Sequence, residues 1–292
     1  MSATAIPSSA PRVISQAASY GGVVIKYEHE STSTGCTMRL NVFLPHHQDE
    51  DLSARWPSLY CLAGLTCTED NFMMKSGAIQ YAAKHGIALI CPDTSPRGLQ
   101  LPGESDVWSL GESAGFYVDA VKEPWSEGYR MYSYVTDELP KLLEAHLPLK
   151  PNCRSVTGHS MGGHGALICF LKNPSAYRSV SAFAPISHPS ASPWGIDAFS
   201  AYLGDDKTLW AQYDATELVS KLQTKACILI DEGLDDPWAH KGQLLLSDFE
   251  AAATRAGVDT NIRRHPRYEH GYYFISTFIA DHIAYHAKFL HD

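Results

Sequence analysis

The chain has 292 residues, of which 45% are hydrophobic and 19% charged, so it is long enough for one large α/β domain and slightly short for two. Its 23 Lys and Arg against 32 Asp and Glu give a formal net charge of −9, which argues against nucleic acid as the main partner. No stretch reaches the roughly 18 apolar residues of a membrane helix. The first residues also lack the charged start and apolar core of a signal peptide.

The cysteines favour a reducing compartment. There are seven of them, an odd number without a C-x-x-C pair, which is typical of free thiols rather than of a disulfide framework. Four lie in apolar runs and are expected in the core, namely Cys61, Cys91, Cys169 and Cys227. Together with the missing membrane and signal segments, this predicts a cytoplasmic protein.

The chain begins with residues 1–22, which are expected to form a partly flexible extension before a single domain at 23–292. Two extended runs, at 23–29 and 37–45, predict an antiparallel start to a sheet. Short apolar runs of the kind that buried parallel strands require follow at 56–64, 86–93, 153–158, 180–185 and 226–233. Helix-compatible segments such as 133–147 and 248–257 lie between them. This alternation predicts an α/β fold with a mostly parallel central sheet flanked by helices.

The segment GHSMGGHGAL, residues 158–167, contains the pattern G-x-S-x-G around Ser160. It directly follows a predicted strand and precedes a small, apolar, helix-compatible stretch, so Ser160 is placed on a strand-to-helix turn. In such a turn the serine hydroxyl is exposed at the carboxyl end of the sheet, and the helix N-terminus favours a developing oxyanion. The alternative is a glycine-rich turn whose serine only caps the helix.

A serine nucleophile needs a histidine base and a carboxylate that orients the base. The predicted strand at 226–233 leads into LDDPW, which offers Asp235 and Asp236, and a later strand leads to His270 just before the closing helix. The order Ser, acid, His is that of α/β-hydrolases. Asp231 and Glu232 are weaker acid candidates because they lie within the strand end. The residues alone leave Asp235 and Asp236 as alternatives.

Other histidines compete with His270 for the role of base. His159 and His164 flank the serine and are expected to pack, because a neighbour of the nucleophile points away from its hydroxyl. His265 lies in the preceding strand. The closing helix carries three more, which are expected to face solvent or pack on the sheet, namely His282, His286 and His291. His46 and His47, in an acidic loop, have no metal-ligand spacing, so no metal site is expected.

Longer blocks carry a resemblance that a lone G-x-S-x-G does not. GLTCTEDNF, PDTSPRG, GFYVDA, GHSMGGHGALICFLKNP and SVSAFAPI resemble the S-formylglutathione hydrolase (esterase D) family, and such blocks run from about residue 23 to the C-terminus. The resemblance implies a cytoplasmic serine thioesterase of the α/β-hydrolase fold, usually a homodimer and without a cofactor. It also implies hydrolysis of S-formylglutathione to glutathione and formate in formaldehyde detoxification, with side activity on short-chain esters. General carboxylesterase or acyltransferase activity on the same fold is the alternative.

The same resemblance assigns site residues. It maps the nucleophile onto Ser160, the acid onto Asp236 and the base onto His270, and it places the oxyanion hole at the backbone N–H groups of Leu65 and Met161. The chain departs from the family pattern at Glu269-His270-Gly271, at DDPWAHKG and at VWSLGESAGF, which all lie around the site.

Five further residues are candidates for substrate binding. Trp194 is either a core aromatic or a wall of the acyl pocket, and Trp238 is a second candidate for that wall. Cys67 is either an ordinary loop residue or, as the resemblance implies, a thiol close enough to the site for its modification to block it. Lys75 and Arg97 follow strands that open toward the site, so they either contact the carboxylates of glutathione or lie on the solvated surface.

Overall fold

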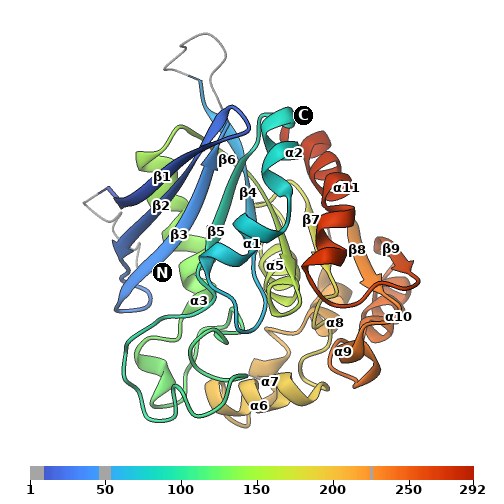
Figure 1. The fold of residues 1–292 in the computed structure, drawn as a ribbon. Helices are drawn as coiled ribbons and strands as arrows, with labels where there is room; N and C mark the ends of the chain where they lie inside the picture. Colours follow the sequence, from blue (N-terminus) through green and yellow to red (C-terminus); the bar gives the residue numbers. More distant parts are fainter. Residues whose placement is uncertain (1–9, 46–53, 224–225) are drawn as a thin grey trace.

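The computed structural model describes residues 10–45, 54–223 and 226–292 (Figure 1). Most of the acidic loop with His46 and His47 lies outside these ranges. Within them, no helix is long and apolar enough to cross a bilayer, and no three His, Cys, Asp or Glu side chains are grouped to hold a metal ion. The strands are β1 (Arg12–Ser19), β2 (Gly22–Glu30), β3 (Thr37–Leu44), β4 (Trp56–Leu62), β5 (Ala88–Pro92), β6 (Leu149–His159), β7 (Val180–Phe183), β8 (Cys227–Gly233) and β9 (Asp259–His265).

These strands form one sheet in the order β1-β2-β3-β5-β4-β6-β7-β8-β9. The pairs β1–β2, β2–β3 and β3–β5 are antiparallel. The pairs β5–β4, β4–β6, β6–β7, β7–β8 and β8–β9 are parallel. The predicted mostly parallel sheet with an antiparallel start is therefore confirmed. The sheet begins earlier than residue 23, since β1 pairs with β2 along its whole length.

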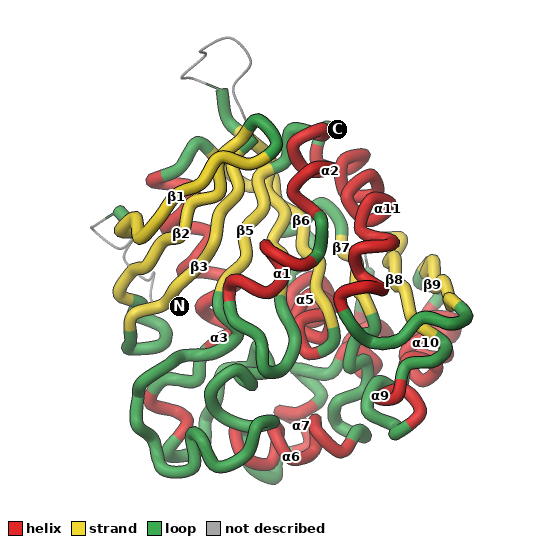
Figure 2. Tube along the Cα trace, viewed as in Figure 1, coloured by secondary structure: helices red, strands yellow, loops and turns green. Residues whose placement is uncertain are grey.

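Helices cover both faces of the sheet (Figure 1). The helices are α1 (Glu69–Lys75), α2 (Ala78–His85), α3 (Met131–Ser133), α4 (Leu139–His146), α5 (Met161–Lys172), α6 (Pro193–Tyr202), α7 (Lys207–Trp210), α8 (Ala215–Leu218), α9 (Pro237–His240), α10 (Leu246–Ala256) and α11 (Tyr272–Leu290), with short 3₁₀ or π segments at Trp125–Glu127, Tyr134–Glu138 and Val219–Lys221. Helices α2 and α11 lie side by side in front of the sheet and α5 lies behind it. Long loops and helices α6, α7 and α9 gather beyond the carboxyl ends of the strands (Figure 2).

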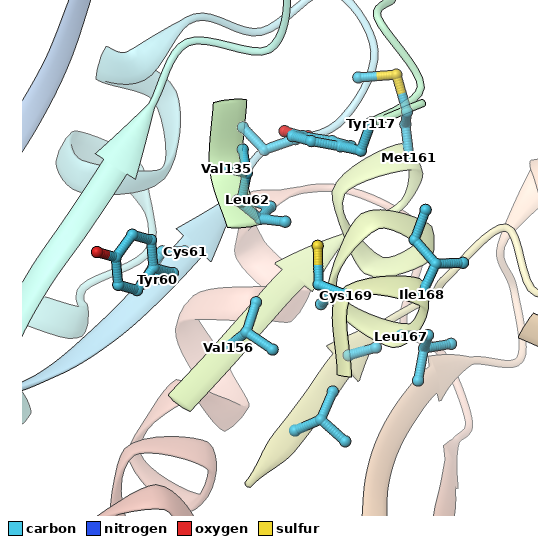
Figure 3. Packing of buried hydrophobic residues seen from close by; sticks show 14 of the residues in the cluster. Tyr60, Cys61, Leu62, Tyr117, Val135, Val156, Met161, Leu167, Ile168 and Cys169 are labelled. Atoms are coloured by element: carbon cyan, nitrogen blue, oxygen red, sulfur yellow. The ribbon is translucent and has the colours of Figure 1, made fainter. Parts of the chain in front are cut away.

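The core lies between the sheet and these helices. Strands β4 and β5 and helix α5 are almost wholly buried, as their continuous apolar sequences require. Figure 3 shows Cys169 of α5 facing Leu62 of β4 and Val156 of β6. Cys61, Cys91 and Cys169 are buried as expected, but the expectation for Cys227 is wrong. That residue is exposed because it is the first of β8, where the strand emerges at the surface.

The closing helix packs on the sheet through two buried histidines. His286 is hydrogen-bonded to the hydroxyls of Ser179 and Ser181, both over 2.8 Å, and His282 to that of Ser181, also over 2.8 Å. The ring of His282 also stacks on Phe183, with centroids 3.8 Å apart. These contacts fix α11, and therefore the position at which the preceding loop with His270 meets the sheet.

Candidate active site

Ser160 lies at the turn between β6 and α5, as the sequence pattern predicts. Its φ of 58° and ψ of −117° are in a region that non-glycine residues rarely adopt, and its N–H donates to the carbonyl of Phe183 over 2.9 Å. A Cβ on Gly162 would lie 2.1 Å from the carbonyl oxygen of Leu62, so only glycine lets α5 start this close to β4. The sharp turn therefore depends on the glycines around the serine.

The loops after β8 and β9 bring Asp236 and His270 together. Leu234 N–H donates to the carbonyl of His265 over 2.9 Å, and Asp235 N–H donates to that of Tyr268 over 3.0 Å. These two bonds join the loops backbone to backbone. Just beyond these bonds along the two loops, His270 Nδ1 lies 2.5 Å from Asp236 Oδ2.

Asp236 is fully buried, and both of its carboxylate oxygens are used. Oδ1 accepts hydrogen bonds from the N–H groups of Trp238 and Ala239, at 2.8 and 3.3 Å, because Asp236 is the N-cap of α9. Oδ2 accepts from His270. The neighbouring Asp235 is exposed, so the geometry distinguishes the two aspartates that the residues alone left as alternatives.

Ser160 and His270 both line a cavity of about 170 Å³. Its other lining residues are Gly64, Leu65, Thr66, Cys67, Trp108, His159, Trp194 and Trp238. The cavity thus joins the serine, the histidine and the loop after β4. A serine and a histidine that line one cavity, with the histidine held by a buried carboxylate, are the groups that acyl transfer requires.

Three tryptophans form one side of the cavity. The ring centroids of Trp108 and Trp194 are 5.2 Å apart, those of Trp194 and Trp238 are 4.6 Å apart, and those of Trp108 and Trp238 are 6.2 Å apart. Trp194 and Trp238 thus both line the cavity rather than lying wholly in the core. Sequence reasoning did not single out Trp108, because its irregular loop has no periodic pattern that would indicate which way it faces.

The loop after β4 lies directly against the serine. A Cβ on Gly64 would be 3.1 Å from Cβ of Ser160 and 3.2 Å from the carbonyl oxygen of His159, so Gly64 permits this approach. Leu65 lines the cavity, and Met161 is the first residue of α5. The first N–H groups of a helix have no partner within it, so that of Met161 is available for an oxyanion.

His159 contacts His270 directly. Its Nε2 lies 2.7 Å from the carbonyl oxygen of His270, and the two rings have centroids 4.5 Å apart. Burial, with a smaller contribution from the charge of His270, holds the pKa of His159 well below its usual value. His164, by contrast, points into the core and binds the carbonyl of Phe116 over 2.8 Å.

Of the other candidates for substrate binding, Cys67 lines the cavity, whereas Lys75 and Arg97 do not. Cys67 lines the cavity and is nearly buried, and burial raises the pKa of its thiol. Lys75 is exposed at the end of α1, with Nζ 5.9 Å from the ring centroid of Tyr272, and does not line the cavity. Arg97 also lies outside the lining and forms a two-bond ion pair with Asp93.

Comparison with known proteins places this site in a family. Residues 31–285 match the family model Esterase, described as "Putative esterase". The chain belongs to this esterase family. Among relatives of this esterase, the mouse protein named S-formylglutathione hydrolase is 53% identical over 93% of this chain and 95% of its own length. The Arabidopsis thaliana protein of the same name is 49% identical over 93% and 95%.

Solved structures are similar to this chain over most of its length. The esterase resembles an S-formylglutathione hydrolase from Agrobacterium tumefaciens with a TM-score of 0.91 and 43% identity, over 95% of this chain and 99% of that one. A fluorophosphonate-binding serine hydrolase of Staphylococcus aureus, at 20% identity, has a TM-score of 0.73 over 91% and 98%, which supports the fold alone. The α/β-hydrolase fold and the resemblance to S-formylglutathione hydrolases are both confirmed.

Proposed function

We propose that this esterase is a serine thioesterase that hydrolyses S-formylglutathione to glutathione and formate. The observation that carries the proposal is the cavity in which Ser160 and the Asp236-bound His270 face the same small space. The substrate comes from the mouse, plant and bacterial relatives, which carry this activity in their names at 43 to 53% identity.

Acylation uses the residues of the cavity in fixed roles. His270 takes the proton of the Ser160 hydroxyl as its oxygen attacks the formyl carbon, and Asp236 stabilises the imidazolium that forms. The N–H groups of Leu65 and Met161 stabilise the oxyanion. When the C–S bond breaks, glutathione leaves as a thiolate and takes up the proton from His270.

Deacylation repeats these steps with water. His270 removes a proton from a water molecule as its oxygen attacks the formyl ester on Ser160, and the proton then returns to the serine oxygen as formate leaves. A thiolate is a good leaving group, so the main task of the protein is to position the carbonyl and stabilise the oxyanion. This chemistry is complete without a metal or an organic cofactor.

The three tryptophans limit the directions in which an acyl group can extend. The rings of Trp108, Trp194 and Trp238 form one side of the cavity of about 170 Å³ that holds Ser160, so a longer acyl chain would have to fit along these rings. Longer acyl chains should therefore react less well. A Trp194→Ala variant should narrow the difference in kcat/KM between S-formylglutathione and S-lactoylglutathione by at least about tenfold, because even one methylene group in an apolar pocket changes specificity by about 10- to 200-fold.

Product analysis tests the reaction class. Purified enzyme and S-formylglutathione should yield formate and free glutathione in equal amounts, in the presence or absence of an added alcohol. Formyl transfer to the alcohol would instead support an acyltransferase. Turnover of aryl esters without turnover of S-formylglutathione would support a general carboxylesterase.

We also propose a homodimer in the cytoplasm. The dimer follows from the family resemblance, and light scattering after size-exclusion chromatography should give the mass of two chains. The cytoplasm is supported by the seven free thiols, six of which are at least partly buried within or beside the core, since such thiols persist in a reducing compartment. Cell fractionation with an antibody to the native chain tests the location.

A further inference from the structure

Arg97 is held rigidly in the loop that follows β5. Its Nε and Nη2 donate to the two carboxylate oxygens of Asp93, over 2.6 and 2.8 Å, in the paired geometry that fixes a guanidinium in one plane. Asp93 is only 3% exposed. The pair therefore sets where the remaining N–H groups of Arg97 point.

The same guanidinium reaches the loop beside Ser160. Nη2 donates to the backbone carbonyl of Cys67 over 3.3 Å and to Oγ of Ser113 over 2.9 Å. The carbonyl of Cys67 also accepts a 2.6 Å hydrogen bond from the buried hydroxyl of Thr94. Arg97 and Thr94 thus hold the last residue of the segment Gly64–Cys67.

This segment has an unfavourable backbone conformation. Thr66 has a φ of 65°, which is uncommon for any non-glycine residue and especially for a β-branched one. Its N–H donates to the carbonyl of Ser113 over 3.1 Å, and Ser113 itself has a φ of 64°. Such conformations persist only where surrounding contacts hold them. Arg97 contacts the segment directly at the carbonyl of Cys67, and indirectly through Ser113, whose carbonyl accepts from Thr66.

We propose that Arg97 is a positioning residue that keeps Gly64–Cys67 against Ser160 and so fixes the Leu65 half of the oxyanion hole. The inference rests on the proposed role of Leu65. This role differs from direct binding of the glutathione carboxylates by Arg97. Nε and Nη2 are occupied by the protein, and the residue does not line the cavity.

Two substrates separate the two roles of Arg97. An oxyanion forms on S-formylglutathione and on an aryl acetate alike, whereas only the former has peptide carboxylates. Arg97→Met should therefore lower kcat on both substrates by about 10- to 100-fold with little change in KM, as expected for a misplaced oxyanion donor. Arg97→Lys should recover part of kcat, and guanidinium ion should partly restore an Arg97→Ala variant.

Further variants distinguish a positioning effect of Arg97 from a general loss of folded protein. Thr94→Val removes the second donor to the Cys67 carbonyl while keeping the ion pair, and should also lower kcat on both substrates. Arg255→Met changes an exposed arginine of α10 and should leave both unchanged. Thermal unfolding of each variant shows which fraction is folded, and kcat is expressed per folded molecule.

The outcomes are distinct. A KM that rises only for S-formylglutathione would overturn the proposal in favour of carboxylate binding. A lower melting temperature with unchanged kcat would overturn it in favour of a purely structural ion pair. If the wild type did not hydrolyse S-formylglutathione but Arg97→Met still lost aryl acetate turnover, the positioning role would stand and the proposed substrate would fail.

Discussion

The ring of His159 packs on that of His270, and its Nε2 donates to the backbone carbonyl of His270 over 2.7 Å. Among the described residues, Nδ1 of His159 has no hydrogen-bond partner, and burial keeps the side chain neutral. The residue before Ser160 thus supports the main chain of His270 without adding a second charge beside it.

Loss of this contact should slow catalysis. His159→Leu removes the donor and is expected to lower kcat by about tenfold, because small misplacements of a catalytic group have large effects on rate. His159→Gln can still donate to the same carbonyl and should retain more of the activity. Steady-state kinetics on an aryl acetate measures both. Equal losses in the two variants would argue against the hydrogen bond as the cause.

The catalytic assignment predicts a graded set of losses. Ser160→Ala and His270→Ala should lower turnover by several powers of ten, and Asp236→Asn by roughly 10⁴ because the histidine would be held in the wrong tautomer. Asp235→Asn is the matched control. It changes the exposed neighbour of Asp236 and should have a small effect. Near-normal kcat in Ser160→Ala would end the assignment of the nucleophile.

Cys67 should make the enzyme sensitive to thiol reagents. The thiol lines the cavity, so an adduct would occupy the space of the acyl group. Burial raises its pKa, so alkylation should be slow at neutral pH and faster as pH rises, because the thiolate is the reacting form. The rate of inactivation by N-ethylmaleimide at several pH values measures this. Cys67→Ser should retain turnover and resist inactivation, and equal sensitivity would indicate another cysteine.

His164 should make stability depend on pH. Burial lowers its pKa to about 4, so the folded state excludes a proton that the unfolded chain binds below pH 6.5. The unfolded state therefore binds more protons between these values, and stability falls as pH falls through this window. From pH 7 to 5 the loss attributable to His164 is about 2 kcal/mol.

The matched variant isolates this contribution. His164→Gln does not titrate and its amide can still donate to the carbonyl of Phe116, so its unfolding free energy should depend less on pH. Urea unfolding of both proteins at pH 7 and 5 gives the comparison. Parallel slopes for the two proteins would show that the acid sensitivity lies elsewhere, for example at His282 and His286.

Regular patterns in the chain were sufficient to predict most of the fold. Continuous apolar runs predict the buried strands, and the run of small residues after Ser160 predicts α5, because burial on both faces leaves few other sequences possible. The exposed strand β1 has no such pattern, and its side chains are largely outside the core. Its pairing depends on backbone hydrogen bonds to β2, and these leave no hydrophobic pattern in the sequence from which β1 could be predicted.

The candidate site also contains residues that the sequence pattern predicts and residues that it does not. Ser160 and His270 follow from their places after strands, whereas the choice of Asp236 over Asp235 needs the family register or the observed cap of α9. Trp108 and Arg97 depend on the irregular loops after β5. There, each side chain's direction is set by particular contacts, such as the pair of Arg97 with Asp93, and not by a repeating pattern.

A single ratio of specificity constants tests whether S-formylglutathione is the substrate. The value of kcat/KM for S-formylglutathione is compared with that for a short aryl acetate, using wild-type enzyme at one pH. A clear preference for S-formylglutathione is expected, because the glutathione portion adds binding energy that positions the reacting carbon. If the aryl acetate were hydrolysed as efficiently or better, the thioesterase function would be contradicted and only a general esterase would remain.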